Sequence, residues 1–369
     1  MRRRDFLAIG LRSGLGCSLL PLAACSREER SLNATNDLTP EKILITDLEK
    51  ELPGMMADAN LPGLSIALIK DAKLVWRRGF GVKDAASKQP IDNDTMFEAA
   101  SMSKPVFAYI VLKLCEKGVM DLDTPLTRYT TERFLQGDPR LELITARHVL
   151  SHTSGFQNWR SEKEPLKIHF APGEKYQYSG EGYSYLQSVV TRLTQQAFGP
   201  YMQANLLEPF GMTLSGYVWN ETCEKHMARP HDAAGKPMNS KKGTEESVAR
   251  YGSAGALLTT PTDYAKFLIE VIEPKGSDAV RLNSESVKEM LRPQIKNGDS
   301  SSWALGWAVQ HTENGDFDYH GGDNDGFHAF AMVSVERKSG YVVMTNGDGG
   351  TKLLNALITR SAMNRFLTT

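Results

Sequence analysis

The sequence predicts an α+β fold in which both ends of the chain build one antiparallel sheet and the middle forms a mostly helical lobe. Strand patterns occur in residues 64–80 and return in residues 303–345, whereas residues 95–270 read mostly as helices and loops. Helical segments at 40–54 and 352–366 flank the two groups of strands. Strands grouped in this way favour a sheet with helices on its faces over alternating strand–helix units.

The composition is that of a globular protein with a large core. The chain has 369 residues, 41% hydrophobic and 24% charged, enough for one domain of two lobes or for two domains. The formal net charge of −1 gives no reason to expect a nucleic-acid partner.

Residues 1–25 read as a targeting segment. Arg3-Arg4-Asp5-Phe6-Leu7 resembles a twin-arginine signal. Leu22-Ala23-Ala24-Cys25 resembles a bacterial lipobox, in which Cys25 would be lipidated after cleavage; the alternative is a general secretion signal cut nearby. Either interpretation predicts export to the periplasm, and the first adds a lipid anchor in the cell envelope.

The mature chain then divides into a spacer and a domain. Residues 26–39 are a polar linker, and the folded unit is expected over 40–369. Ser26 after the cysteine is the residue that the lipoprotein pattern associates with the outer membrane. No later run of about 18 apolar residues occurs, so the lipid would be the membrane attachment.

The first elements of the domain are a helix and a hairpin. Pro40 at a helix start, with leucines at helical spacing, predicts an amphipathic helix that ends near Pro53-Gly54. The hairpin pairs Leu64–Ile69 with a strand from Leu74 to Phe80 across a turn at Asp71-Ala72-Lys73.

Helices dominate the middle and strands the end. The helices are expected at Val106–Lys117, Leu141–Leu150, Tyr183–Phe198 and Pro261–Ile272. The later strands are expected at Trp303–Val309, Phe317–His320, His328–Val335 and Tyr341–Thr345, followed by a helix at Lys352–Phe366.

Ser101-Met102-Ser103-Lys104 is the Ser-x-x-Lys of this chain, placed just before a strongly apolar helix. Residues three apart lie on one helix face, so Lys104 can take the proton that a serine hydroxyl must lose to become a nucleophile. Burial disfavours the charged form of a lysine. Pro105 confines the helix start to this region, and the N-terminal dipole favours a developing oxyanion.

A Ser-x-x-Lys arises by chance about once or twice in a chain of this length, so other segments must support it. The loop from Pro172 to Tyr183 carries three tyrosines before an apolar helix. Tyr178 there is a candidate for relaying the proton to the leaving group, with a packing role as the alternative.

His320-Gly321-Gly322 ends a predicted strand, and its glycines would let a substrate lie against the backbone. The N–H near Asp323 is a candidate to pair with that of Ser101 as an oxyanion hole; a hairpin turn is the alternative. The acidic segment that follows lacks the glutamate of a calcium loop.

No metal or cofactor is expected. His148 and His152 are four residues apart but lack a third ligand, so we interpret them as structural. The chain has no Gly-x-Ser-x-Gly elbow, P-loop or dinucleotide fingerprint. Cys115 reads as a core residue and Cys223 as part of a polar loop, and two unpaired thiols are favoured over a disulfide.

Taken together, these segments resemble the serine β-lactamase and penicillin-binding superfamily, in its class C β-lactamase-like branch of carboxypeptidases, esterases and D-aminopeptidases. The matching motifs occur in order through most of the mature chain: Pro62-Gly63, Ser101-x-x-Lys104, His148 to Gly155, Pro172-Gly173, Tyr178-Ser179-Gly180, Pro209 to Met212, Ser253 to Leu258, Leu305-Gly306-Trp307 and His320-Gly321-Gly322.

The resemblance implies Ser101 as acylated nucleophile, Lys104 as its base, Tyr178 as second proton-transfer group and His320-Gly321-Gly322 as the substrate-binding strand. Two departures follow from the same comparison. Gly180 stands where relatives carry the asparagine of Tyr-x-Asn, which puts efficient β-lactam turnover in doubt. His320 and Gly321 replace a lysine and a hydroxyl residue, which leaves a weaker, pH-dependent positive charge.

The sequence therefore predicts an exported, cofactor-free serine hydrolase that cleaves an ester or amide through an acyl-enzyme on Ser101. An esterase acting on small acyl substrates is the first choice. A carboxypeptidase or endopeptidase acting on cell-wall peptides comes second, and a β-lactamase third. The alternative of another class is a lipoprotein that captures cell-wall peptides or β-lactams with slow turnover. The oligomeric state stays open.

Overall fold

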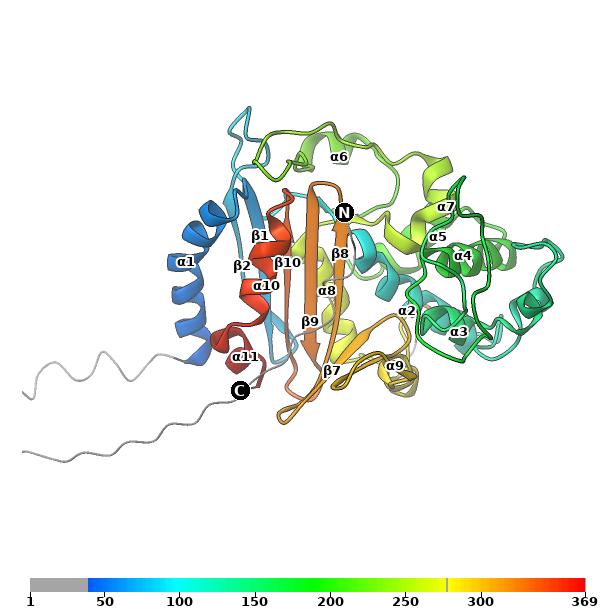
Figure 1. The fold of residues 1–369 in the computed structure, drawn as a ribbon. Coiled ribbons are helices and arrows are strands. Elements are labelled where there is room, and N and C mark those ends of the chain that lie inside the picture. The colour runs from blue at the N-terminus through cyan, green and yellow to red at the C-terminus, as the bar shows by residue number, and fades with distance from the viewer. Residues whose placement is uncertain (1–38, 277, 369) are drawn as a thin grey trace, which may run out of the picture.

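The computed structural model describes residues 39–276 and 278–368, and its centre is an eight-stranded antiparallel sheet (Figure 1). The strands run in the order β2-β1-β10-β9-β8-β7-β6-β5, so the N-terminal hairpin pairs with the C-terminal strand. This arrangement confirms the α+β fold. The strand bounds are β1 Gly63–Lys70, β2 Lys73–Gly81, β5 Ile295–Lys296, β6 Ser301–Trp303, β7 Ala308–Thr312, β8 Gly315–Asn324, β9 Phe327–Ser334 and β10 Ser339–Thr345.

Helices cover both faces of this sheet. Ile66 and Leu68 of β1 pack with α1 (Pro40–Asp58), α10 (Gly350–Ile358) and α11 (Ser361–Thr368). Their neighbours Ala67 and Ile69 point to the other face, into a core shared with α8 (Pro261–Ile272) and the helical lobe. Because successive strand residues face opposite sides, β1 is buried on both, which explains its mostly apolar sequence.

The N-terminal helix is longer than predicted. Helix α1 runs through Pro53 to Asp58, with Leu52 and Met56 both buried against the sheet. A proline inside a helix removes one backbone hydrogen bond. Burial of the apolar face on either side of Pro53 outweighs that loss, so Pro53-Gly54 does not end the helix.

The hairpin was predicted at the right place. Asp71 and Ala72 have φ of 49° and 53°, the left-handed conformation at both central positions of a two-residue turn. This geometry matches the right-handed twist of the flanking strands.

The helical lobe lies beside the sheet, drawn mainly in cyan and green in Figure 1. Its bounds, with the helix that follows it, are α2 Ser103–Glu116, α3 Ala146–Leu150, α4 Gly180–Thr194, α5 Phe198–Met202, α6 Glu221–His226, α7 Glu245–Gly255 and α9 Ser284–Leu291. Two short strands, β3 (Phe97–Glu98) and β4 (Leu258–Thr259), pair with each other and were not predicted.

Three predicted helices divide into two pieces each. The segment at 141–150 is a 3-10 turn, Pro139–Leu143, followed by α3, because Thr145 caps a new helix. The helix predicted at 183–198 is α4, which ends at Thr194 because Gln195 takes φ of 54°. Phe198 already belongs to the separate helix α5. The C-terminal segment breaks between α10 and α11.

The strand bounds also differ from the prediction. Trp303–Val309 is not one strand: Gly306 takes φ of 87° in a turn that joins β6 to β7. Strand β8 extends past His320 to Asn324, so His320-Gly321-Gly322 lies inside the strand rather than at its end.

The leader (1–25), with Cys25, lies outside the described residues, as does the linker apart from Thr39. Among the described helices, none has the length and apolarity to cross a bilayer. Cys115 and Cys223 are both free thiols, as favoured, but Cys223 lies buried on α6 rather than in a polar loop, and Cys115 is partly buried.

Candidate active site

Ser101 and Lys104 lie next to each other at the start of α2. The Nζ of Lys104 is 3.1 Å from the Oγ of Ser101 and donates a second hydrogen bond of 2.6 Å to the carbonyl oxygen of Ala254. Lys104 is 1% exposed, whereas Ser101 is partly exposed. The pair has the distance that proton transfer between nucleophile and base requires.

A strained turn presents the nucleophile. Ala100 takes φ of 48°, a conformation that costs a residue with a Cβ of order 1–3 kcal/mol and persists where the surroundings impose it. Ser103 imposes it here, since its Oγ donates to the carbonyl of Ala100 at 2.7 Å and accepts from the N–H of Leu257 at 3.0 Å. The hydroxyl of Tyr264 donates to the carbonyl of Met102 at 2.9 Å.

The lysine is enclosed by aromatic rings. Its Nζ lies 4.8 Å from the ring centroid of Tyr178 and 5.4 Å from that of Tyr183. Tyr178 therefore lies beside Lys104, which is the proximity that a proton relay needs. Sequence reasoning did not single out Tyr183, whose ring is fully buried.

His152 holds the loop that carries Tyr178. Its Nδ1 accepts a hydrogen bond of 3.0 Å from the N–H of Ser179, and its carbonyl accepts one of 2.8 Å from Gln177. Its ring lies 4.1 Å from that of Tyr178. Burial, with the nearby charge of Lys104, lowers the pKa of His152 well below its usual value. The structural interpretation of His152 is consistent with these contacts.

Strand β8 passes close to the nucleophile turn. A Cβ added at Gly322 would lie 2.2 Å from the carbonyl oxygen of Ala99, so only a glycine allows this approach. Gly321 pairs with Phe330 of β9 beside it. The ring of His320 lies 6.4 Å from that of Tyr178. The strand thus brings its motif to the tyrosine and the serine.

The predicted pH-dependent charge on His320 is wrong. Burial, then the charge of Lys104, lowers the pKa of His320 to about 3. Its Nδ1 lies 2.7 Å from the carbonyl oxygen of Gly321, and its Nε2 has no hydrogen-bond partner among the described residues. His320 is therefore neutral near pH 7 and offers no cation to a substrate carboxylate.

Asp323 and Asn324 continue β8 past the site. The carboxylate of Asp323 is exposed and lies 3.3 Å from Nδ1 of His328, away from any calcium-loop arrangement. Asn324 donates a hydrogen bond of 2.6 Å to Glu98, whose pKa is raised by burial. The oxyanion role of the Asp323 N–H stays a prediction.

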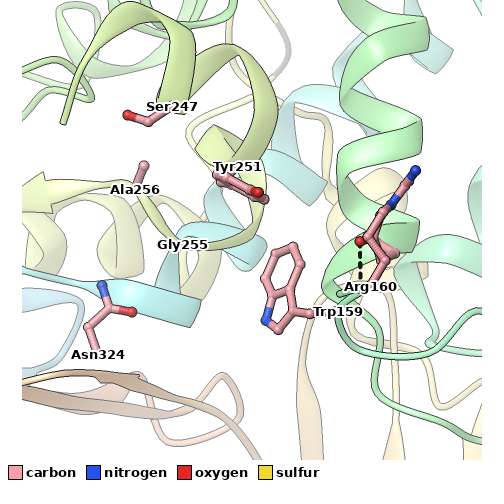
Figure 2. A pocket seen from close by; sticks show the side chains of 8 residues that line it. Trp159, Arg160, Ser247, Tyr251, Gly255, Ala256 and Asn324 are labelled. Carbon is pink, nitrogen blue, oxygen red and sulfur yellow. Dashed lines mark hydrogen bonds and ion pairs between the residues drawn. The ribbon is translucent and has the colours of Figure 1, made fainter. Parts of the chain in front are cut away.

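A pocket of about 380 Å³ adjoins the nucleophile turn, since a Cβ added at its lining residue Gly255 would lie 3.8 Å from the carbonyl carbon of Ala100. Figure 2 shows the side chains that line it. Its lining comes from the loop before α4, the start of α4, the C-terminal half of α7 and the end of β8: Trp159, Arg160, Glu181, Ser247, Tyr251, Gly255, Ala256 and Asn324. None of these was predicted as a site residue. Trp159 sits four residues after the His148 to Gly155 motif, and nothing in its neighbours along the sequence indicates that its ring enters a pocket.

Gly180 does not line that pocket but decides its shape. A Cβ added at Gly180 would lie 2.3 Å from Cζ2 of Trp159. The indole ring therefore occupies the space into which a side chain at this position would extend.

The described residues hold no group of three or more histidine, cysteine or carboxylate side chains arranged to bind a metal. His148, the other candidate, caps α3 with Thr145. His148 and His152 thus serve separate structural contacts.

Comparison with known proteins identifies a family. Residues 48–362 match the family model described as "Beta-lactamase". The chain is 23% identical over 332 residues to "Protein flp" of Staphylococcus aureus (strain N315), covering 85% of this chain and 64% of that protein. It is 30% identical over 219 residues to "Esterase EstB" of Burkholderia gladioli, covering 52% and 55%. The match thus spans less than two thirds of each relative's length.

The fold is also similar to that of solved structures. The crystal structure of a "Beta-Lactamase/D-Alanine Carboxypeptidase" from Pseudomonas syringae superposes with a TM-score of 0.74 at 19% identity, over 86% of this chain and 99% of that one. The sequence resemblance, the Ser101–Lys104 pair and the sheet topology agree with one another. This chain belongs to the β-lactamase family of serine hydrolases.

Proposed function

We propose that the protein is an esterase-like serine hydrolase that works through an acyl-enzyme on Ser101. The observation that carries the proposal is the 3.1 Å contact between Lys104 Nζ and Ser101 Oγ in a buried setting with Tyr178 beside it. No other serine is needed for this chemistry, and no cofactor takes part in it.

The reaction has two half-reactions. Ser101 Oγ attacks the substrate carbonyl while the neutral amine of Lys104 takes its proton, and the N–H groups of Ser101 and Asp323 stabilise the oxyanion. Tyr178 passes a proton to the leaving group as its bond to the carbonyl carbon breaks. Water then attacks the acyl-enzyme and gives a proton to the same groups, which pass it to Ser101 Oγ as the bond between Oγ and the acyl carbon breaks and the acid leaves.

Two features favour ester over β-lactam substrates. Gly180 offers no amide to an acylamide side chain, and Trp159 fills the adjacent space. His320 is neutral near pH 7, so it does not provide the cation that would bind a β-lactam carboxylate. The name of the relative "Esterase EstB" supports the same choice. A D,D-carboxypeptidase or β-lactamase is the second candidate, since the solved relative from Pseudomonas syringae carries both names.

The test is time-resolved intact mass spectrometry of residues 40–369, mixed separately with a chromogenic short-chain ester and with benzylpenicillin. Ester turnover with a transient adduct, and slow or absent penicillin addition, is the expected result. A long-lived penicillin adduct with negligible ester turnover would contradict the esterase proposal and favour the penicillin-binding alternative. Ser101→Ala is the control for both substrates.

We further propose that the protein is exported and anchored through a lipid on Cys25, on the evidence of its first 25 residues. The N-terminal peptide of membrane-extracted protein should begin at a diacylglyceryl-modified Cys25. Recovery of an unmodified N-terminus downstream in the soluble fraction would contradict the anchor but not the hydrolase.

A further inference from the structure

The pocket beside the active site has an aromatic wall. The rings of Trp159 and Tyr251 meet edge to face, with centroids 5.4 Å apart and planes 82° apart. Figure 2 shows both rings on one side of the pocket, with Ala256 and Asn324 on the other. Tyr251 is 38% exposed, and the guanidinium carbon of Arg250 lies 5.0 Å from its ring centroid.

The two charged side chains of the pocket are already paired with each other. The guanidinium of Arg160 pairs with Glu181 at 2.6 Å and its carbon lies 4.7 Å from the ring centroid of Phe134. Asn324 donates to Glu98. A ligand therefore meets an ion pair that is neutral as a whole, an amide whose nitrogen already donates to Glu98, and two aromatic rings. The two rings favour apolar and aromatic groups.

The pocket is joined to the reacting atoms through the backbone. Gly255 and Ala256 follow Ala254, whose carbonyl oxygen accepts the hydrogen bond from Lys104. Glu181 lies three residues after Tyr178. The pocket is thus built from the two chain segments that contact Lys104 and carry Tyr178. A group bound in the pocket is therefore held in a fixed position relative to Ser101.

We propose that this pocket binds the acyl group of the substrate and selects esters of bulky apolar or aromatic acids, with Trp159 as the residue that determines specificity. The inference rests on the proposed esterase function. The acyl group stays attached through both half-reactions, whereas the leaving group departs after the first. A pocket that holds the acyl group therefore stabilises both transition states.

Gly180 also determines the shape of this pocket. Because Gly180 has no side chain, the indole of Trp159 can fill the space beside it. An asparagine at 180 would overlap that indole, so the two side chains cannot both occupy this space. Trp159→Gly alone removes the wall, and Trp159→Gly with Gly180→Asn replaces it by an amide.

The experiment measures kcat/KM for p-nitrophenyl acetate, butyrate and phenylacetate, which share a leaving group, on the wild type, Trp159→Phe and Trp159→Ala. We expect the wild type to prefer phenylacetate, and Trp159→Ala to lower the phenylacetate to acetate ratio by about tenfold, the scale at which an apolar pocket discriminates. Trp159→Phe should keep most of the preference. Trp76→Ala, the same truncation on β2, is the matched control and should leave the ratio unchanged.

Two outcomes separate the two proposals. An unchanged ratio in folded Trp159→Ala, with normal acetate turnover, overturns the pocket assignment and leaves the esterase intact. The esterase function is overturned if the wild type turns over none of the esters while a fluorophosphonate still labels Ser101. The pocket assignment then falls with it.

Discussion

The two sides of the active site are built differently. On the nucleophile side, Lys104 and Ser103 are fully buried and hydrogen-bonded to the backbone of Ala254, Ala100 and Leu257. On the pocket side, Trp159 and Tyr251 are partly exposed and come from two separate segments of the helical lobe. Buried, hydrogen-bonded groups are costly to alter, whereas exposed rings change at little cost in stability. Under the two proposals above, the first side fixes the reaction and the second sets the substrate.

The largest effect should come from removing the base on the nucleophile side. Lys104→Ala should slow acylation of Ser101 by about 10²- to 10⁴-fold, the usual contribution of a general base. Stopped-flow measurement of the ester burst gives the rate. Lys117→Ala, at the exposed C-terminal end of the same helix, is the matched control. An unchanged acylation rate in folded Lys104→Ala would remove the lysine from the mechanism.

A second prediction concerns the pocket side. Gly180→Asn should lower ester kcat/KM by about tenfold or more and destabilise the protein by about 1–3 kcal/mol, because the new Cβ would overlap the Trp159 ring. Adding Trp159→Gly should relieve the overlap and raise β-lactam acylation above that of either single variant. A gain in β-lactam acylation by Gly180→Asn alone would show that the indole does not obstruct this position.

The third prediction tests whether the nucleophile turn depends on one hydroxyl. Ser103→Ala leaves the buried N–H of Leu257 without its acceptor and frees the strained Ala100 turn. The free energy of unfolding should fall by about 1–3 kcal/mol, with kcat lowered more than KM is raised. Ser188→Ala, which removes an exposed hydroxyl bonded within α4, is the control for urea denaturation. Equal stability of the two variants would contradict the role of Ser103.

The smallest effect should appear as a pH dependence. The pKa of His320 is about 3 in the folded protein, against about 6.5 unfolded, so between these values the unfolded state binds more protons. Stability should therefore fall as pH drops below about 6.5, by about 1.4 kcal/mol for this histidine at pH 5.5. His320→Gln should reduce the difference between urea midpoints at pH 7.5 and 5.5, while His152, whose pKa is also lowered by burial, keeps part of that difference. An equal difference in both proteins would contradict a buried neutral histidine.

The sequence predicted the nucleophile side better than the pocket side, for a physical reason. Ser101 and Lys104 are three residues apart, so local helical geometry brings them together. Tyr178 and His320 reach them from distant segments: the loop and strand patterns made both residues candidates, and the resemblance implied their roles. Trp159 and Gly180 meet through packing of a loop against a helix start, which no local periodicity encodes.

The fold shows the same division between local and distant effects. The hairpin at Asp71-Ala72 and helix α8 follow from short-range patterns and were found correctly. Helix α1 continued through Pro53 because burial against the sheet outweighed the local signal. The charge on His320 was wrong for the same kind of reason, since its burial depends on the tertiary structure.

One measurement tests the central claim most directly. The purified protein is labelled with a fluorophosphonate, digested and mapped by tandem mass spectrometry, alongside Ser101→Ala and Lys104→Ala. The account predicts a single adduct on Ser101, none in Ser101→Ala, and labelling slowed by orders of magnitude in Lys104→Ala. An adduct on another residue, or equally fast labelling of Lys104→Ala, would contradict it.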